Sequence, residues 1–358
     1  MKKPKDNFTG TGAIVGGVLG LIMNIVGQSK EKKENPHKEF DFQSLILVGM
    51  IGAIIGSVSF EIIKLLLSVF TSKEEILDEA DEISYLGSVL NSYQPDEIDK
   101  QVLQKGKQLK LAIKREFSNK LLGRGVTYQG STVQGTAVSG LSDLDILVKF
   151  KRTSFSKEED MHDALHNFLK YRFNDTDLIG IREQKHSLGL IYKLNGSKEI
   201  IDVVPTLRTD FIRGKNEYNL FRNPKLLTGS RKLKMNPNIQ KDLGDNENEK
   251  IEIIRLLKIL KSEKKLPLKS ILITELTKKA FQEIRMPKKL NQKLVLILNF
   301  IKDNIKTIQV KSPDNLRISL TDSLSIKDKE EINIALDAVL DDLKNDKNYL
   351  LDYFPEKS

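Results

Sequence analysis

The sequence predicts an α/β (α+β) fold with a helical C-terminal lobe and an N-terminal transmembrane helical hairpin. Two β-rich segments, residues 143–148 and 187–207, carry the alternating or continuous apolar side chains typical of sheet strands. Helical patterns flank both segments and continue toward the C-terminus, and two uncharged segments lie near the N-terminus. We therefore predict three parts: a membrane-anchoring hairpin at 1–73, a core that contains the sheet at 74–228, and a helical lobe at 229–358.

The two uncharged segments are residues 11–27 and 42–60. Each approaches the ~20 apolar residues that a helix needs to cross a bilayer, although the first is short and contains Asn24. Glycines recur at every fourth position in both, which places small surfaces along one helical face where two helices in lipid can meet. A membrane hairpin is favoured over two alternatives, a buried soluble helical hairpin and a cleaved signal peptide.

Composition limits the classes of site. The residues after 73 are numerous enough for two lobes with a substantial core. The absence of cysteine excludes disulfides and thiolate zinc sites. The net charge of +9 suits polyanionic partners such as nucleotides, RNA or an anionic lipid surface, and it does not choose among them. A chain without tryptophan offers few stacking platforms, so sequence-specific binding of single-stranded RNA is less expected.

Residues 129–148 supply two parts of one chemical site. Gly130 allows backbone N–H groups to approach an anion, and Ser131 adds a hydroxyl donor where a helix can begin. Asp143 and Asp145 would lie on the same face of a strand, and two adjacent carboxylates repel each other unless a cation lies between them. The pair therefore predicts a shared divalent metal ion. Taken singly, an ordinary loop and a solvated strand edge are the alternatives for the two parts.

A third carboxylate lies in the second β-rich segment. Asn195 and Gly196 form the dipeptide best suited to a tight hairpin turn, which predicts a strand on either side. Asp202 lies in the second of these strands among isoleucines and valines, where a lone aspartate needs a partner. We predict that Asp202 is a third metal ligand; the alternative is an edge strand with this side chain in water.

These residues resemble the site of the DNA polymerase β nucleotidyltransferase superfamily, with Gly130-Ser131, Asp143, Asp145 and Asp202 at the matching positions. The segments GSTVQGTAVSGLSDLDILV and IDVVP are most similar to the bacterial CD-NTases, which are relatives of cyclic GMP-AMP synthase and oligoadenylate synthase. The resemblance extends over most of the chain after the N-terminal segments. It implies a polymerase β-like nucleotidyltransferase core with a mixed sheet, followed by a helical lobe.

A second block, residues 253–281, resembles the helix, Leu-Pro link and helix that close the nucleotide site in that family. There, a lysine on the first helix and a serine near the second bind the triphosphate. The matching positions here are Lys258 and Ser270. The alternative for Lys258 is a solvated lysine on a helix face.

The resemblance implies a metal-dependent enzyme that uses ATP or other nucleoside triphosphates together with two Mg²⁺ ions, or Mn²⁺ in their place. Asp143 and Asp145 would hold the ion that bridges the triphosphate, and all three aspartates the ion that activates a ribose hydroxyl. Asp202 is then the candidate general base. The implied activity is synthesis of a cyclic or short linear oligonucleotide second messenger in anti-phage defence, with release of pyrophosphate.

Two alternatives remain open. One is template-independent addition of nucleotides to RNA, of the CCA, poly(A) or oligoadenylate type, or to a protein or small molecule. The other is a non-enzymatic membrane protein that retains the fold. For the favoured activity we expect a multi-pass membrane protein with its catalytic part in the cytoplasm, where the triphosphates are, and a downstream effector protein as partner. The hairpin is then either an anchor or a fused pore-forming element.

Overall fold

The computed structural model describes residues 78–209, 217–226 and 233–357. The predicted membrane hairpin at 1–73, with its spans at 11–27 and 42–60, lies outside these residues. None of the helices in the described part of the chain combines the length and the apolarity that crossing a bilayer requires.

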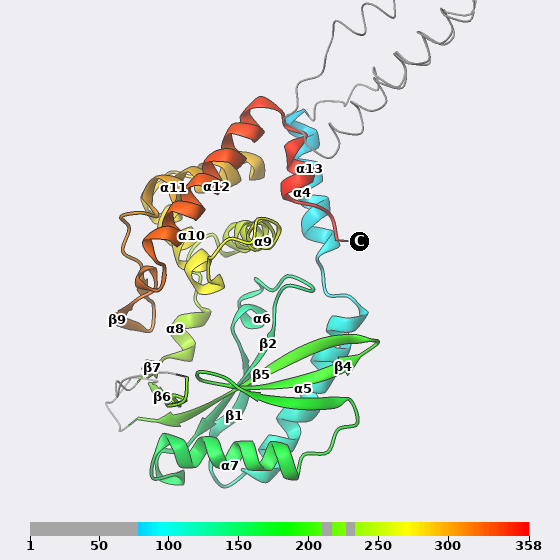
Figure 1. Cartoon of the computed structure of the whole chain (residues 1–358), viewed down its shortest axis with the longest axis vertical. Helices are drawn as coiled ribbons and strands as arrows, with labels where there is room; N and C mark the ends of the chain where they lie inside the picture. The colour runs from blue at the N-terminus through cyan, green and yellow to red at the C-terminus, as the bar shows by residue number, and fades with distance from the viewer. Residues whose placement is uncertain (1–77, 210–216, 227–232, 358) are drawn as a thin grey trace, which may run out of the picture. The chain divides into compact units, whose positions relative to one another are not determined.

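A seven-stranded sheet forms the centre of the N-terminal half of the described chain (Figure 1). Its main path runs in the order β1-β2-β5-β4-β3, and β6 and β7 extend from the far end of β5. β2 and β5 are parallel, whereas the other neighbours are antiparallel, so the predicted mixed sheet is confirmed. The strands are β1 (Leu121–Gln129), β2 (Leu144–Phe150), β3 (Leu178–Glu183), β4 (Leu188–Leu194), β5 (Ser197–Arg208), β6 (Tyr218–Leu220) and β7 (Leu233–Met235).

The turn between β4 and β5 is the predicted two-residue hairpin. Asn195 and Gly196 both have positive φ, 48° and 88°, which is the backbone that the commonest two-residue hairpin turns require. Leu194 and Ser197 close the ladder on either side. The turn fixes the register of β5 and thereby the position of Asp202 in the sheet.

Two helices, α5 (Glu97–Glu116) and α7 (Glu158–Tyr171), cover one face of the sheet. Leu109 of α5 and Leu165 of α7 share a core with Ile146 and Val203 from the two central strands. Because side chains alternate along a strand, the residues between these core positions point to the opposite face. Gly106 brings α5 close to β2, since a Cβ there would lie 2.6 Å from Cδ2 of Leu144.

A second core lies among the helices of the C-terminal half, as predicted (Figure 1). Its helices are α9 (Glu247–Glu263), α10 (Ser270–Glu283), α11 (Leu290–Asn304), α12 (Ile326–Asn345) and α13 (Tyr349–Tyr353). α4 (Glu79–Ser92) precedes the sheet in the sequence, but its buried side chains belong to this helical core. Arg255 of α9 holds α4 in place by donating to the carbonyls of Leu90 (2.7 Å) and Tyr93 (3.2 Å).

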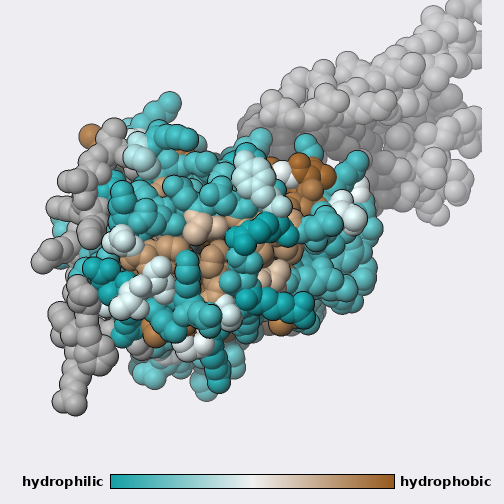
Figure 2. Space-filling view, turned by 90° about the horizontal axis from the view of Figure 1, so that it is seen from below, coloured by the Kyte–Doolittle hydropathy of each residue, from teal (hydrophilic) through white to brown (hydrophobic). Residues whose placement is uncertain are grey.

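Short elements connect the two cores. α6 (Ser131–Gln134) follows β1, and α8 (Pro237–Lys241) leads from β7 into the helical part. β8 (Lys311–Ser312) and β9 (Asn315–Ser319) form a separate small hairpin. Seen from below, hydrophilic residues surround a central apolar area of the surface (Figure 2).

Candidate active site

Residues paired in register form a single row across five strands of the sheet. The row runs from β3 to β1 through Arg182, Gly189, Asp202, Asp145 and Gln129. Residues at paired positions of neighbouring strands point to the same face. This face is the one opposite α5 and α7, so the row lies on the side of the sheet that those helices leave open.

The parallel pairing of β2 and β5 brings Asp145 and Asp202 directly side by side. Asp143 lies just before β2, and its side chain is exposed. The charge of its carboxylate raises the pKa of both other aspartates. Within the described ranges, no three carboxylate or imidazole side chains approach closely enough to form a finished metal cluster.

The pKa shifts of Asp145 and Asp202 indicate that their carboxylates repel each other. Burial, followed by the charges of Asp202 and Asp143, raises the pKa of Asp145 to about 7. Burial and the charge of Asp143 also raise the pKa of Asp202, against the opposing effects of a hydrogen bond from Gln184 and the charge of Arg182. A divalent cation would favour the charged form of both groups.

The donor set fits such a cation. Carboxylate oxygens are the protein ligands that Mg²⁺ prefers, and Asp145 and Asp202 present them from neighbouring positions of a rigid sheet. Asp143 adds a third carboxylate on the short segment that leads into β2. These residues are therefore compatible with a metal site.

The Gly-Ser turn lies against this carboxylate pair. Gly130 follows β1 directly and has a φ of 67°, and a Cβ at this position would lie 2.3 Å from Oδ2 of Asp145. Only glycine combines that backbone with that clearance. α6 begins at Ser131, and the first N–H groups of a helix have no acceptor within the helix. The structure thus brings the turn and Asp145 together.

Lys258 reaches the same turn from the helical part of the chain. It is only 5% exposed, and its Nζ donates to the carbonyl oxygen of Thr136 at 2.7 Å. The N–H of Thr136 in turn donates to the carbonyl of Ser131. Burial lowers the pKa of Lys258 to about 8, with Lys261 adding to the effect and Asp145 opposing it. The solvated-lysine alternative is therefore wrong.

Comparison with solved structures identifies the fold. No protein-family model and no curated protein matches the sequence. Escherichia coli MS115-1 CdnC, solved with ATP, matches at 15% identity with a TM-score of 0.58, over 75% of this chain and 92% of that one. The Bradyrhizobium diazoefficiens CD-NTase CdnG, in complex with GTP, matches at 14% identity with a TM-score of 0.58, over 77% of this chain and 96% of that one.

This chain has the fold of the bacterial CD-NTases. A further match, the Escherichia coli MS115-1 CdnC:HORMA-deltaN complex, gives a TM-score of 0.57 at 15% identity, over 75% of this chain and 91% of that chain. At such identities the likeness shows the fold alone. It agrees with the nucleotidyltransferase core and helical lobe that the sequence predicts.

Ser270, the second predicted triphosphate ligand of the helical part, lies at the start of a helix. It is the first residue of α10, and its side chain is exposed. Its carbonyl accepts a hydrogen bond from Thr274 within the same helix. None of the hydrogen bonds found among the described residues joins Ser270 to Lys258 or to the aspartates, so its predicted role in triphosphate binding stays a prediction.

Sequence reasoning missed two members of the site in this CD-NTase fold. Gln184, in the turn between β3 and β4, donates from Nε2 to Oδ1 of Asp202 at 2.8 Å. Gly189, in β4, is the row position beside Asp202. A glycine inside a strand often marks a position that another group approaches closely, so Gly189 could have indicated that a side chain packs against this part of β4.

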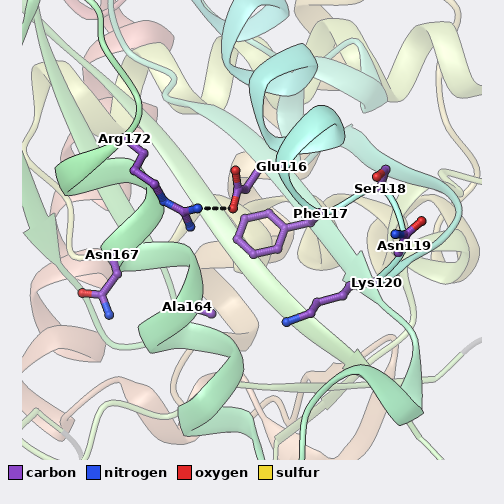
Figure 3. Close-up of a pocket in the computed structure, with 8 residues that line it drawn as sticks. All are labelled: Glu116, Phe117, Ser118, Asn119, Lys120, Ala164, Asn167 and Arg172. Atoms are coloured by element: carbon purple, nitrogen blue, oxygen red, sulfur yellow. Dashed lines mark ion pairs between the residues drawn. The ribbon is translucent and has the colours of Figure 1, made fainter.

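A pocket at the end of α5 is a different site. A pocket of about 420 Å³ lies at the C-terminal end of α5, where Arg172 and Glu116 form an ion pair of 2.6 Å beside Phe117 (Figure 3). It is lined from the α5 and α7 side of the sheet. The aspartate row points to the other face, so this pocket is not part of the candidate active site.

Proposed function

We propose that this chain is a metal-dependent nucleotidyltransferase that joins nucleoside triphosphates into a cyclic or short linear oligonucleotide second messenger and releases pyrophosphate. The observation that carries the proposal is the in-register pair Asp145 and Asp202 beside the Gly130 turn, within a CD-NTase fold. Two proteins of similar fold were solved with ATP and with GTP, which supports a triphosphate as the substrate class. A role in anti-phage defence belongs to the same proposal.

Asp143, Asp145 and Asp202 would hold two Mg²⁺ ions, or Mn²⁺ in their place. Bound there, such ions offset the charge of a triphosphate and make a ribose hydroxyl more acidic. The remaining chemistry belongs to the side chains. Asp202 accepts the proton of the attacking ribose hydroxyl as general base.

The oxygen that loses its proton attacks the α-phosphorus of the second nucleotide, and the bond from that phosphorus to pyrophosphate breaks. Negative charge grows on the leaving pyrophosphate in the transition state, so hydrogen-bond donors near it lower the barrier. The backbone N–H groups at the start of α6 would supply such donors. The ammonium of Lys258, which reaches the same turn from α9, would supply another. The hydroxyl of Ser270 would bind the triphosphate from the start of α10.

The test is product analysis by mass spectrometry. The full chain is incubated with ATP, GTP, CTP and UTP and with Mg²⁺, with and without tRNA. We expect a product of low molecular weight and pyrophosphate from the wild-type protein, and no product from Asp145→Asn. Nucleotides attached to tRNA would instead establish the alternative of template-independent addition to RNA. Unchanged triphosphates in every reaction, despite a folded protein, would contradict the proposed enzyme.

A membrane location is proposed from the sequence alone. The uncharged segments at 11–27 and 42–60 would anchor the enzyme, with its catalytic part in the cytoplasm and a separate effector protein as the receptor of its product. Fractionation of cells that express the full chain checks the anchor. We expect the protein in the membrane fraction and a chain without residues 1–73 in the supernatant; a full chain that stays in the supernatant contradicts it.

A further inference from the structure

The row across the sheet contains one position without a side chain. Gly189 lies between Arg182 and Asp202, and a Cβ there would lie 2.7 Å from Nε2 of Gln184 and 3.1 Å from Oδ1 of Asp202. The amide of Gln184 therefore occupies the space that an ordinary side chain at 189 would fill. Since Gly189 does not have positive φ, its backbone conformation does not require glycine. The close approach of the amide does.

The hydrogen bonds of Gln184 form a directed chain. The hydroxyl of Ser187, which is buried, donates to Oε1 of Gln184 at 2.7 Å. Nε2 of Gln184 then donates to Oδ1 of Asp202 at 2.8 Å. A carboxylate only accepts, so the contact with Asp202 fixes which end of the amide is the nitrogen. Each bond in such a chain strengthens the next.

The turn that carries Gln184 is itself held in place. The N–H of Gln184 donates to the carbonyl of Ser187 at 2.9 Å, which closes the turn between β3 and β4. The N–H of Asn223 donates to the carbonyl of Lys185 at 3.0 Å, and this joins the turn to the segment after β6. These two backbone hydrogen bonds hold the turn from which Gln184 donates to Asp202.

Asp202 needs such a partner because Asp145 is its neighbour. Two carboxylates at paired positions repel each other, and a side chain free to rotate would turn away from the like charge. A donor on Oδ1 opposes that rotation. The other oxygen of the same carboxylate, Oδ2, then remains available to bind a metal ion.

We propose that Gln184 is a positioning residue that fixes the carboxylate of Asp202 for metal binding and proton transfer, with Ser187 orienting Gln184. The inference rests on the proposed function, because it assigns a role at the same site. Partners that orient metal-binding carboxylates typically change metal affinity or activity about 10- to 100-fold when they are removed.

The test measures the dissociation constant of Mn²⁺ by electron paramagnetic resonance on the full chain, together with kcat and KM for product formation. Gln184→Leu keeps the size of the side chain and removes the donor. We expect Mn²⁺ binding about 10-fold or more weaker than in the wild type, with kcat lowered and KM for the triphosphate little changed. Ser187→Ala, which leaves the amide in place without its partner, should give a smaller loss in the same direction.

Two glycines of the same sheet give a matched pair of variants. In Gly189→Ala the new methyl displaces the amide of Gln184 and also lies close to Oδ1 of Asp202, so this variant should reproduce the loss or exceed it. In Gly180→Ala the methyl meets only Cδ1 of Ile191, at the ordinary distance of 3.9 Å, and Mn²⁺ binding should stay at the wild-type value. A melting curve for each variant confirms folding. If Gln184→Leu does not fold, Ser187→Ala and Gly189→Ala decide the question.

Wild-type Mn²⁺ affinity and kcat in folded Gln184→Leu, or in folded Ser187→Ala together with Gly189→Ala, would overturn the role of Gln184 and leave the proposed function standing. A wild-type protein that neither binds Mn²⁺ nor forms product would overturn the proposed function, and the inference with it. The wild-type measurement thus separates the two failures.

Discussion

Asp145 and Asp202 occupy paired positions on two parallel strands, so the fold places two carboxylates next to each other on one face of the sheet. Both have raised pKa values, chiefly because they are partly buried and then because of neighbouring carboxylates. In the absence of a cation, the folded chain therefore favours a proton on this pair.

Removal of one carboxylate should stabilise the metal-free protein at neutral pH. The pKa of Asp145 rises from 3.8 to about 7 on folding, so between these values the folded chain binds more protons than the unfolded chain. Stability due to this group is therefore present at low pH and is lost as the pH rises toward 7. In EDTA, we expect Asp145→Asn to exceed the wild type at pH 8 by on the order of 1–3 kcal/mol, with the difference disappearing near pH 4. Urea unfolding at each pH measures it, and a difference that does not change with pH contradicts the prediction.

A divalent metal ion should make the wild type more stable than Asp145→Asn. A ligand that binds only the folded state stabilises it by about 2.7 kcal/mol at 100 times its dissociation constant. Mn²⁺ should therefore raise the melting temperature of the wild type and leave Asp145→Asn nearly unchanged. Asp160→Asn, at an exposed aspartate of α7, is the matched control and should respond like the wild type. Equal shifts in Asp145→Asn and Asp160→Asn would place the metal elsewhere.

The local parts of the site could be predicted from the sequence because each has a local cause. Asn195 and Gly196 indicated a hairpin turn, and that turn is present. A lone aspartate in an apolar strand indicated a metal ion as the partner of Asp202; the fold places Asp145 beside it, and metal binding stays a prediction. Gly130 lies directly against Asp145, and its predicted role in binding a phosphate stays a prediction.

The remaining parts depend on contacts between distant segments. The row that brings Gly189 and Gln184 to Asp202 follows from strand register, which short-range patterns do not specify. The burial of Lys258 also could not be predicted from the residues around it in the sequence. A lysine usually marks the solvent face of a helix, but every residue from Ile253 to Leu260 is buried, because neighbouring helices pack around α9 and Lys258 reaches the turn at Thr136.

Gly130→Ala and Gly123→Ala separate backbone strain from a clash with the site. Both glycines have positive φ, 67° and 55°, so alanine at either position should cost about 1 kcal/mol or more of stability. At Gly123 nothing lies within 4 Å of the new Cβ, whereas at Gly130 it would lie 2.3 Å from Oδ2 of Asp145. We expect only Gly130→Ala to lose product formation, by at least about 10-fold. Rate assays on folded protein check this, and equal losses of activity in the two variants would contradict it.

Lys258→Met should weaken both the fold and triphosphate binding. The variant removes the donor to the buried carbonyl of Thr136, and an orphaned buried acceptor costs about 1–3 kcal/mol. It also removes the cation that reaches this turn at Thr136, so KM for the triphosphate should rise. Lys261→Met, on the same helix and partly exposed, is the control and should change neither quantity appreciably. A Lys258→Met protein with wild-type KM would exclude Lys258 from triphosphate binding.

Lys357 joins the end of the described chain to the start of α5. Its Nζ donates to Oδ2 of Asp96 at 2.7 Å and also to the hydroxyl of Ser139, and its N–H donates to Oγ of Ser92 at 2.9 Å. Asp96 caps α5, and the hydrogen bond from Lys357, followed by one from the backbone of Asp99, lowers its pKa to about 2.

Lys357→Met should therefore raise the pKa of Asp96 toward its usual value. A lowered carboxyl pKa adds stability above about pH 4 and loses it as the pH falls through about 2, so the variant should be less stable than the wild type only in the higher range. Because both side chains are partly exposed, we expect a difference below about 1 kcal/mol at pH 7, and less in 1 M salt. Carboxyl NMR titration and urea unfolding measure the two effects. A difference in stability that persists at pH 2 and in high salt would mean that packing of the Lys357 stem, rather than its charge, fastens this segment to α5.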